Sequence, residues 1–322
     1  MSVSGNVLEM IGNTPMTTLS KLDTGCCHLF GKLELMNPGG SIKDRIALYM
    51  IRAAEQQGLI KPGDTLVEAT AGNTGLGLAL VAAQKGYKML IVMPDKMSME
   101  KEYNLRAMGA TVIRTRSDVV KGHPEYYQEV AARLAREMPN AFFVNQFANP
   151  ANVQAHYETT GPEIWQQMDG KIDAVVVGVG SGGTLSGVGR YLKEKNPAID
   201  IVLADPEGSI LDLYHRTGEF KQAGSWLVEG IGEDFIPSIC DMSLVTCSYE
   251  IPDRESIHVV RELLAKEGLM GGSSTGTLLA AALRYCREQK TPKRVVTLVP
   301  DTGTRYVSKV YNDDWLLEKG LL

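Results

Sequence analysis

The sequence predicts an α/β protein with largely parallel sheets. Apolar runs of strand length alternate with longer helical patterns along the 322 residues, and glycine-rich turns join several runs to the helix that follows. No repeat of fixed period and no low-complexity tract interrupts this alternation. Because a chain of this length exceeds the size at which single cores usually stop growing, we expect two domains.

Composition excludes several classes of protein. The content of 44% hydrophobic and 22% charged residues is typical of a globular protein, and the net charge of −5 provides no basic surface for nucleic acid. No run approaches the ~18 apolar residues of a membrane span, and the N-terminus lacks the pattern of a secretory signal. The five scattered cysteines resemble neither a disulfide framework nor a paired zinc motif. We therefore expect a cytoplasmic protein that binds no nucleic acid, membrane or metal.

The first elements lead to a polar turn. A strand is expected at residues 28–35, followed by Asn37-Pro38-Gly39-Gly40-Ser41-Ile42-Lys43-Asp44-Arg45 and a helix at 43–57. Ser41 is the expected N-cap, which places Lys43 in the first turn, where the helix dipole favours a neutral amine. A neutral lysine is a nucleophile that can form a Schiff base with a carbonyl compound. The alternative is an ordinary exposed lysine beside a turn.

The next segments repeat a strand–turn–helix pattern. Residues 65–69 predict a strand, 70–75 a glycine turn and 76–85 a helix. The same reasoning predicts strands at 89–93, 110–114 and 141–144, and helices at 98–108 and 125–137. The loop at 145–152 is interpreted as a domain boundary.

A second α/β set follows this loop. Its expected strands are 174–177, 199–204 and 295–299, and its expected helices are 160–168, one ending at Lys195, 254–267 and 275–289. Residues 218–241 are expected to be irregular. Three glycine turns in the whole chain open helices, at 70–75, 178–184 and 271–277. Because the N–H groups of a helix N-terminus point outward, each turn is a candidate site for an anion.

The middle glycine turn allows three interpretations. Gly178, Gly180 and Gly183 form a G-x-G-x-x-G between a strand and a helix, and Asp205 ends the next strand, so a nicotinamide dehydrogenase is one hypothesis. The succession Ser181-Gly182-Gly183-Thr184 favours instead a single phosphate held by N–H groups and a threonine hydroxyl. A turn that serves only tight packing is the third interpretation.

Six motifs occur in order along the chain. They are Ile11-Gly12-Asn13-Thr14-Pro15, Asn37 to Arg45, Ala71-Gly72-Asn73-Thr74-Gly75, Gly180-Ser181-Gly182-Gly183-Thr184, Glu229-Gly230-Ile231-Gly232 and Pro300-Asp301-Thr302-Gly303. Together they resemble the fold-type-II pyridoxal-phosphate enzymes of the cysteine synthase and cystathionine β-synthase group. The resemblance implies two doubly wound α/β domains with the cofactor in the cleft between them. Residues 35–147 would form the smaller domain, and residues 1–34 and 148–322 the larger one.

The resemblance also implies pyridoxal 5′-phosphate as cofactor and gives each site residue a role. Lys43 corresponds to the Schiff-base lysine and catalytic base, Asn73 to the partner of the ring 3-oxygen, and Ser274 to the partner of the pyridine nitrogen. The implied phosphate-binding residues are Gly180, Ser181, Gly182, Gly183 and Thr184. The implied substrate-binding residues are Thr70, Ala71, Gly72, Asn73, Thr74, Gln146, Glu229 and Gly230. Ala71 replaces the usual serine of the family and so lacks one hydroxyl.

The implied reaction is β-replacement on L-serine or O-acetyl-L-serine, through an internal aldimine and an aminoacrylate to which a thiol adds. A serine beside the pyridine nitrogen does not favour ring protonation, which favours elimination over transamination. Homocysteine as the thiol gives L-cystathionine by transsulfuration, whereas sulfide gives L-cysteine, the reaction of a cysteine synthase. Segments 205–211, 228–237 and 314–320 resemble cystathionine β-synthase, and segments 147–152 and 159–165 resemble cysteine synthase. We predict homocysteine, with sulfide as the alternative.

Glu229 bears on this choice, because cysteine synthases often have glutamine at this position. Its carboxylate can accept a hydrogen bond from the amino group of homocysteine, a group that sulfide lacks. The alternative is that Glu229 only orders its glycine loop.

The extent of the resemblance leads to further expectations. The sequence covers the catalytic core, so we expect no haem extension, no regulatory C-terminal module, no haem, no metal and no adenosylmethionine control. A homodimer is expected from the resemblance alone. The nicotinamide dehydrogenase is the hypothesis from another class, and a non-catalytic binding protein with the same fold is a fourth possibility, which the presence of Lys43 opposes.

Overall fold

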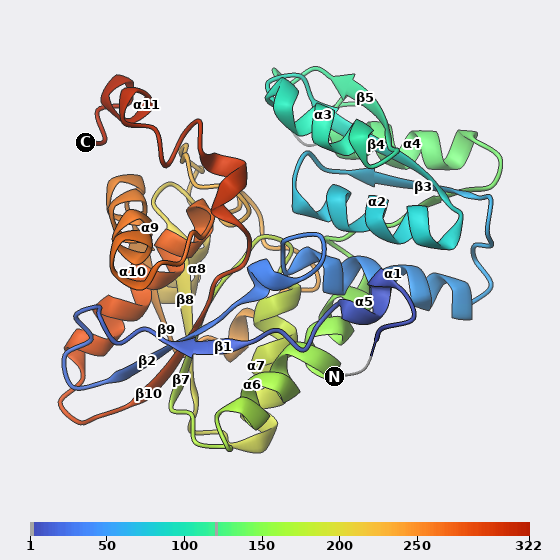
Figure 1. The fold of residues 1–322 in the computed structure, drawn as a ribbon. Helices are drawn as coiled ribbons and strands as arrows, with labels where there is room; N and C mark the ends of the chain where they lie inside the picture. Colours follow the sequence, from blue (N-terminus) through green and yellow to red (C-terminus); the bar gives the residue numbers. More distant parts are fainter. Residues whose placement is uncertain (1–2, 120–121) are drawn as a thin grey trace. The chain divides into compact units, whose positions relative to one another are not determined.

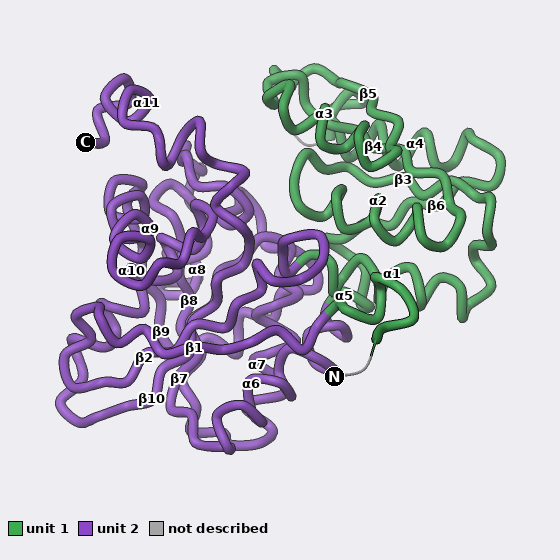
Figure 2. Tube along the Cα trace, in the orientation of Figure 1, with its two compact units in different colours: residues 1–11, 43–152 green, residues 12–42, 153–322 purple. Residues whose placement is uncertain are grey.

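The computed structural model describes residues 3–119 and 122–322. The chain divides into two compact units (Figure 2): unit 1 consists of residues 1–11 and 43–152, and unit 2 of residues 12–42 and 153–322. Each unit contains its own sheet, so the predicted α/β class is confirmed. The chain passes from unit 2 into unit 1 between Ile42 and Lys43. The domain boundaries predicted from the sequence, after residues 34 and 147, stay a prediction.

Unit 1 contains a four-stranded parallel sheet in the order β5-β4-β3-β6. Its strands are β3 (Thr65–Ala69), β4 (Lys88–Pro94), β5 (Thr111–Thr115) and β6 (Ala141–Phe143). Its helices are η1 (Val7–Met10), α1 (Lys43–Gln56), α2 (Asn73–Lys85), α3 (Met99–Ala107) and α4 (Tyr127–Glu137), while α5 (Pro150–Ala155) crosses into unit 2. Val130 and Ala131 of α4 pack on Val67, Leu90 and Val92 of the sheet. One face of the sheet is thus covered by α4.

Unit 2 contains a six-stranded sheet in the order β1-β2-β10-β7-β8-β9, in which only β1 is antiparallel to its neighbour. The strands are β1 (Met16–Thr18), β2 (His28–Lys32), β7 (Ala174–Gly178), β8 (Asp200–Pro206), β9 (Cys247–Ile251) and β10 (Arg294–Leu298). The α-helices are α6 (Gly161–Gln167), α7 (Gly183–Lys195), α8 (Leu211–Thr217), α9 (Asp253–Glu267), α10 (Ser273–Glu288) and α11 (Asp313–Glu318). Shorter helical turns are η2 (Glu34–Met36), the π-helical η3 (His156–Thr160), η4 (Met242–Leu244) and η5 (Gly303–Tyr306). Figure 1 shows α9 and α10 on one side of this sheet and α6 and α7 on the other.

Many predicted elements lie within two residues of the observed ones, including α1 and β3. The sequence missed β1, β9 and α8, it placed the first half of α5 in the expected loop at 145–152, and it predicted no element at 153–159, where α5 ends and η3 lies. It also placed the start of α2 at Leu76, whereas α2 begins at Asn73. The helix starts earlier because Gly72, in an extended conformation, is its N-cap. Residues 73–75 of the predicted turn are therefore helical.

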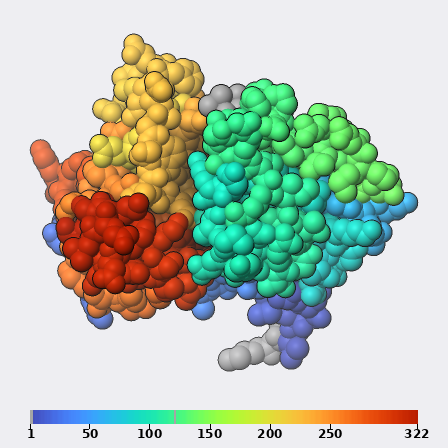
Figure 3. All heavy atoms as spheres, turned by 90° about the horizontal axis from the view of Figure 1, so that it is seen from above, coloured from blue at the N-terminus to red at the C-terminus, as the bar shows by residue number. Residues whose placement is uncertain are grey.

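The segment between α8 and η4 contains no helix or strand, as predicted for residues 218–241. It reaches the surface of unit 2, in the yellow to orange part of Figure 3. Phe220 in this segment is 66% exposed. Within residues 3–119 and 122–322, no helix has the length and apolar character of a membrane span.

Candidate active site

In unit 1, Lys43 and the 70–74 turn are brought together because α1 packs on α2. Lys43 is the first residue of α1, and Asn73 is the first residue of α2. A Cβ at Gly77, one turn into α2, would lie 3.0 Å from the carbonyl oxygen of Lys43. Glycine at this position allows the close approach of the two backbones. The first turns of α1 and α2 are therefore neighbours.

The role of Ser41 as N-cap of α1 stays a prediction; Ser41 lies two residues before Lys43, the first residue of the helix. It forms an isolated bridge with Asp301, and the N–H of Ile42 donates to the carbonyl of Pro300 at 2.8 Å. This backbone pairing is extended rather than helical. The helix begins at Lys43, so Ile42 is the residue directly before it.

Gln146 lies directly against the 70–74 turn. The hydroxyl of Thr74 donates to Gln146 Oε1 at 2.7 Å, and Asn152 Nδ2 donates to the carbonyl of Gln146 at 2.8 Å. The N–H of Gly72 donates to Thr70 Oγ1 at 3.2 Å, which orders the turn internally. Thr70, Thr74, Gln146 and Asn152 are all buried. Unit 1 thus brings together the predicted site residues Lys43, 70–74 and Gln146.

Glu68 is a neighbour of this group that the sequence analysis did not identify. It is 1% exposed, and its Oε1 accepts a hydrogen bond from the N–H of Ala69 at 3.1 Å. Burial raises the pKa of Glu68 to about 8, although the backbone hydrogen bond from Ala69 acts in the opposite direction. Its Oε2 has no hydrogen-bond partner among the described residues. The signal for Glu68 in the sequence is that it is the one acidic residue in the otherwise apolar end of β3.

In unit 2, the glycine turn before α7 fits a phosphate group. Gly182 has φ +89° and is the N-cap of α7, whose first N–H groups point outward. A Cβ at Gly180 would lie 2.5 Å from the carbonyl oxygen of Gly230, and one at Gly182 would lie 2.5 Å from the Cβ of Cys240. Larger residues would therefore displace the turn from this conformation. Because its glycines carry no side chains, the turn leaves its backbone N–H groups accessible to a ligand.

The hydroxyl of Thr184 is fixed from outside the turn. Thr184 Oγ1 lies 3.2 Å from Nε2 of His156, and Nδ1 of the same ring lies 2.9 Å from Oγ1 of Thr160. His156 is 1% exposed and lies in the π-helical turn η3. The only signal for His156 in the sequence is its i, i+4 spacing to Thr160, and His156 was not among the predicted site residues. This chain of contacts orients the threonine at the start of α7.

The 229–230 loop and the start of α10 lie beside this turn. The N–H of Glu229 donates to Ser273 Oγ at 2.9 Å, and the adjacent Ser274 is 5% exposed. Glu229 Oε1 accepts from Lys309 Nζ at 2.9 Å. Because Gly230 also packs against Gly180, the predicted site residues of unit 2 form one group.

The motif at residues 300–303 orders the start of α10. The N–H of Gly272 donates to the carbonyl of Asp301 at 3.0 Å, and a Cβ at Gly272 would lie 2.0 Å from Asp301 Oδ1. The hydroxyl of Tyr306 donates to Asp301 Oδ2 at 2.7 Å. The motif therefore acts on Ser274 through the backbone of the helix start.

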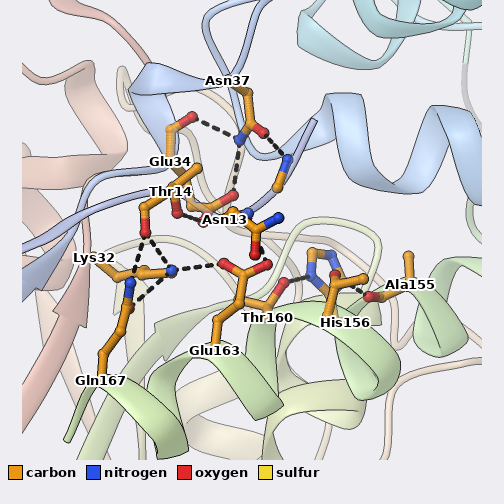
Figure 4. Close-up of polar contacts among 12 residues, drawn as sticks. Asn13, Thr14, Lys32, Glu34, Asn37, Ala155, His156, Thr160, Glu163 and Gln167 are labelled. Carbon is orange, nitrogen blue, oxygen red and sulfur yellow. Dashed lines mark hydrogen bonds and ion pairs between the residues drawn. The ribbon is translucent and has the colours of Figure 1, made fainter. Parts of the chain in front are cut away.

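The motif at residues 11–15 joins a buried polar network (Figure 4). Lys32 Nζ, which is fully buried, donates to the carbonyl of Thr14 at 2.7 Å and to Glu163 Oε2 at 2.6 Å. Glu34 accepts from the hydroxyl of Thr14 at 2.6 Å and from Asn37 Nδ2 at 2.9 Å. The network thus fixes Asn37, at the beginning of the turn that leads to α1.

Asp205 does not have the environment that a dehydrogenase requires. It is fully buried, and its Oδ2 accepts from the N–H of Asp212 at 2.9 Å, in the first turn of α8. Burial raises the pKa of Asp205 to about 6. The carboxyl group holds α8 against β8 and is not presented to a ribose. In the described parts of the chain, no group of three or more His, Cys, Asp and Glu residues could hold a metal ion.

Comparison with known proteins gives the family. Residues 7–301 match the family model described as pyridoxal-phosphate dependent enzyme. The chain is 46% identical to a cystathionine beta-synthase of Mus musculus over 98% of this chain. It is 44% identical to cysteine synthase 1 of Neurospora crassa, over 97% of this chain and 84% of that protein. It is also 42% identical to the O-acetylserine dependent cystathionine beta-synthase of Bacillus subtilis, over 96% of this chain and 98% of that protein.

The chain covers only part of some of these relatives, and it also resembles a solved structure. The chain spans 57% of the length of the Mus musculus protein and 63% of a cystathionine beta-synthase of Apis mellifera. A crystal structure of a hydrogen sulfide-producing enzyme from Fusobacterium nucleatum superposes with a TM-score of 0.87 at 38% identity, over 94% of this chain and all of that one. The predicted fold-type-II architecture and the predicted cofactor are thereby confirmed. The family match and the glycine turn that fits a phosphate agree: this chain belongs to the pyridoxal-phosphate-dependent enzymes.

Proposed function

We propose that this protein catalyses β-replacement on L-serine or O-acetyl-L-serine with L-homocysteine, which gives L-cystathionine. The observation that carries the proposal is the 42% identity to the O-acetylserine dependent cystathionine beta-synthase of Bacillus subtilis, because it extends over nearly the full length of both chains. Lys43 at the start of α1 supplies the amine that such a reaction needs.

Each of the predicted cofactor-binding residues would make a different contact with the cofactor. The N–H groups of the turn before α7 and the hydroxyl of Thr184 would bind its phosphate. Asn73 and Ser274 would contact its ring, and Lys43 would attach it covalently. When bound, pyridoxal phosphate supplies an electron sink conjugated to the α-carbon of the substrate.

The residues of unit 1 would bind the amino-acid donor and move its proton. The 70–74 turn offers backbone N–H groups at the start of α2 and the hydroxyl of Thr70, which suit a carboxylate, while the hydroxyl of Thr74 donates to Gln146 and orders the turn. Ala71 contributes only its backbone. Lys43, in the first turn of α1, would take the α-proton, because the positive end of the helix dipole favours its neutral form.

Glu229 would select the thiol. Its carboxylate can accept a hydrogen bond from the amino group of homocysteine, and its ion pair with Lys309 at 2.9 Å orients it. Sulfide has no group that could use this acceptor. A cysteine synthase activity with sulfide is the second candidate, favoured by the 44% identity to cysteine synthase 1 of Neurospora crassa.

Product analysis tests the proposal. The enzyme, purified with added cofactor, is given serine or O-acetylserine, each with homocysteine or sulfide, and the products are identified by mass spectrometry. We expect cystathionine as the faster product, and Lys43→Ala should abolish it together with the visible absorbance of the bound cofactor. Glu229→Leu, which removes the acceptor, should lower the rate with homocysteine and leave the rate with sulfide unchanged. A wild type that gives no product with any pair, or that makes only cysteine, contradicts the assignment.

We also expect a homodimer that works in the cytoplasm, on the basis of the resemblance. Sedimentation velocity of the enzyme tests the dimer, and a monomer over the working range of concentrations would refute it.

A further inference from the structure

Three successive backbone N–H groups of the segment between α8 and η4 are held by side chains from two helix starts. The carboxylate of Asp253, the first residue of α9, accepts from the N–H of Leu227 at 2.8 Å and from that of Val228 at 3.2 Å, one on each oxygen. The next N–H, that of Glu229, donates at 2.9 Å to Oγ of Ser273, the first residue of α10. The main chain that carries Glu229 is therefore fixed by two side chains that are distant in the sequence.

The two helix starts are themselves joined closely. Helices α9 and α10 pack side by side in unit 2 (Figure 1), and Oγ of Ser256 lies 2.8 Å from Oγ1 of Thr277 between them. A Cβ at Gly276 would collide with the carbonyl oxygen of Ser256, so glycine allows the close approach of the two backbones. Asp253 and Ser273 therefore hold the segment from one common base.

The residues that follow connect this base to the glycine turn before α7. Val228 is 4% exposed and belongs to the core of unit 2, whereas Glu229 is partly exposed. Further along, the N–H of Gly232 donates to the carbonyl of Val179 in the glycine turn at 2.9 Å. The stretch 227–232 thus runs from the two helix starts to the turn that fits a phosphate group.

We propose that Asp253 is a positioning residue that places Glu229 for its hydrogen bond to the amino group of the thiol substrate. This inference rests on the proposed function for the role of Glu229. A carboxylate that accepts from two successive N–H groups fixes the orientation of both peptide units, which a hydrogen bond to only one of them would not do. Asparagine has nearly the same shape but keeps only one acceptor oxygen, so it should hold the segment less firmly.

The test uses the holoenzyme and three main variants. Asp253→Ala removes both acceptor oxygens, and Asp253→Asn keeps one. Glu255→Ala is the matched control, because Glu255 lies in the same first turn of α9 and its carboxylate pairs with Arg284 of α10. Should Asp253→Ala fold poorly, Asp253→Glu keeps the charge and displaces the carboxylate by one methylene.

Amide hydrogen exchange without substrate gives the first measurement. We expect exchange at Leu227 and Val228 to become about tenfold faster in Asp253→Ala, since each amide loses one hydrogen bond, and to change less in Asp253→Asn. Glu255→Ala should leave both amides at the wild-type rate. Equal exchange in Asp253→Ala and wild type overturns the positioning role, and this result does not depend on which reaction the enzyme catalyses.

Steady-state kinetics give the second measurement. Asp253→Ala should raise KM for homocysteine about tenfold, because Glu229 loses its position, while KM for the amino-acid donor and the rate with sulfide stay unchanged. In a Glu229→Leu background, Asp253→Ala should add no further change, as expected of a residue that acts through Glu229.

Two kinetic outcomes contradict the positioning role. One is an equal rise of KM for homocysteine and for the donor, and the other is an undiminished effect of Asp253→Ala in the Glu229→Leu background. A wild type that rejects homocysteine refutes the proposed function, whereas unchanged exchange at Leu227 and Val228 refutes the role of Asp253, so the two failures are distinguishable.

Discussion

Replacing Glu68 by glutamine should stabilise the protein, and the gain should grow with pH. Burial raises the pKa of Glu68 from its ordinary value of 4.5 to about 8. Between these two values the folded protein keeps a proton on Glu68 that the unfolded chain has already lost. The wild type therefore loses stability as the pH rises through this window, because the folded state then binds more protons than the unfolded state.

The magnitude follows from the two pKa values. At about 1.36 kcal/mol for each pKa unit, the full effect above the window is about 5 kcal/mol, and at neutral pH it is about 3 kcal/mol. The Glu68→Gln variant has no carboxyl group at this position, so its free energy of unfolding does not fall in this way as the pH rises. Below about pH 4.5 the acid is protonated in both states, and the two proteins then differ only by the fit of the amide.

The assay is urea unfolding of wild type and Glu68→Gln, each saturated with cofactor, at several pH values between about 5 and 9. The difference in the free energy of unfolding should increase in favour of Glu68→Gln up to about pH 8 and then level off. Glu102→Gln is the control, because its two arginine partners lower the pKa of Glu102 and leave it ionised throughout this range. A difference between wild type and Glu68→Gln that is flat across this range would refute the reasoning.

Three further substitutions test the packing around the site. Gly180→Ala should weaken cofactor binding, measured by titration of the apoenzyme, because the new Cβ would lie 2.5 Å from a backbone carbonyl oxygen. Lys32→Met should destabilise the protein by about 3–5 kcal/mol in urea unfolding, since it removes one partner of a buried ion pair; adding Glu163→Gln should recover part of the loss. Gly187→Ala should lower the free energy of unfolding by about 1–3 kcal/mol, because its Cβ would lie 2.4 Å from the carbonyl oxygen of Val153.

The parts of the fold that the sequence predicted are those with a strong local signal. The helix α1 and the strand β3 have clear periodicity and clear stop signals, and both were predicted within a residue. By contrast, β1 has three residues and β9 is buried mainly at its last residue, so neither shows an alternating pattern. These strands exist because a neighbouring strand pairs with them, which is a tertiary effect.

The same distinction applies to the candidate site. Lys43 and the three glycine turns are visible because a glycine turn before a helix is a local pattern. Glu68 and His156 are not visible in this way. Glu68 is buried at the end of β3 next to the 70–74 turn, and His156 contacts Thr184 at the start of α7, so the surroundings of both residues are set by the fold.

The G-x-G-x-x-G of residues 178–183 shows why a motif needs its surroundings to be interpreted. In the sequence it fits a dinucleotide as well as a single phosphate, because both ligands use the N–H groups at a helix start. The two hypotheses differ in what the acid after the next strand must do. A dinucleotide requires Asp205 to be exposed to a ribose, whereas Asp205 is fully buried and holds the first turn of α8. The burial of one carboxyl group, rather than the glycines, therefore decides between the two ligands.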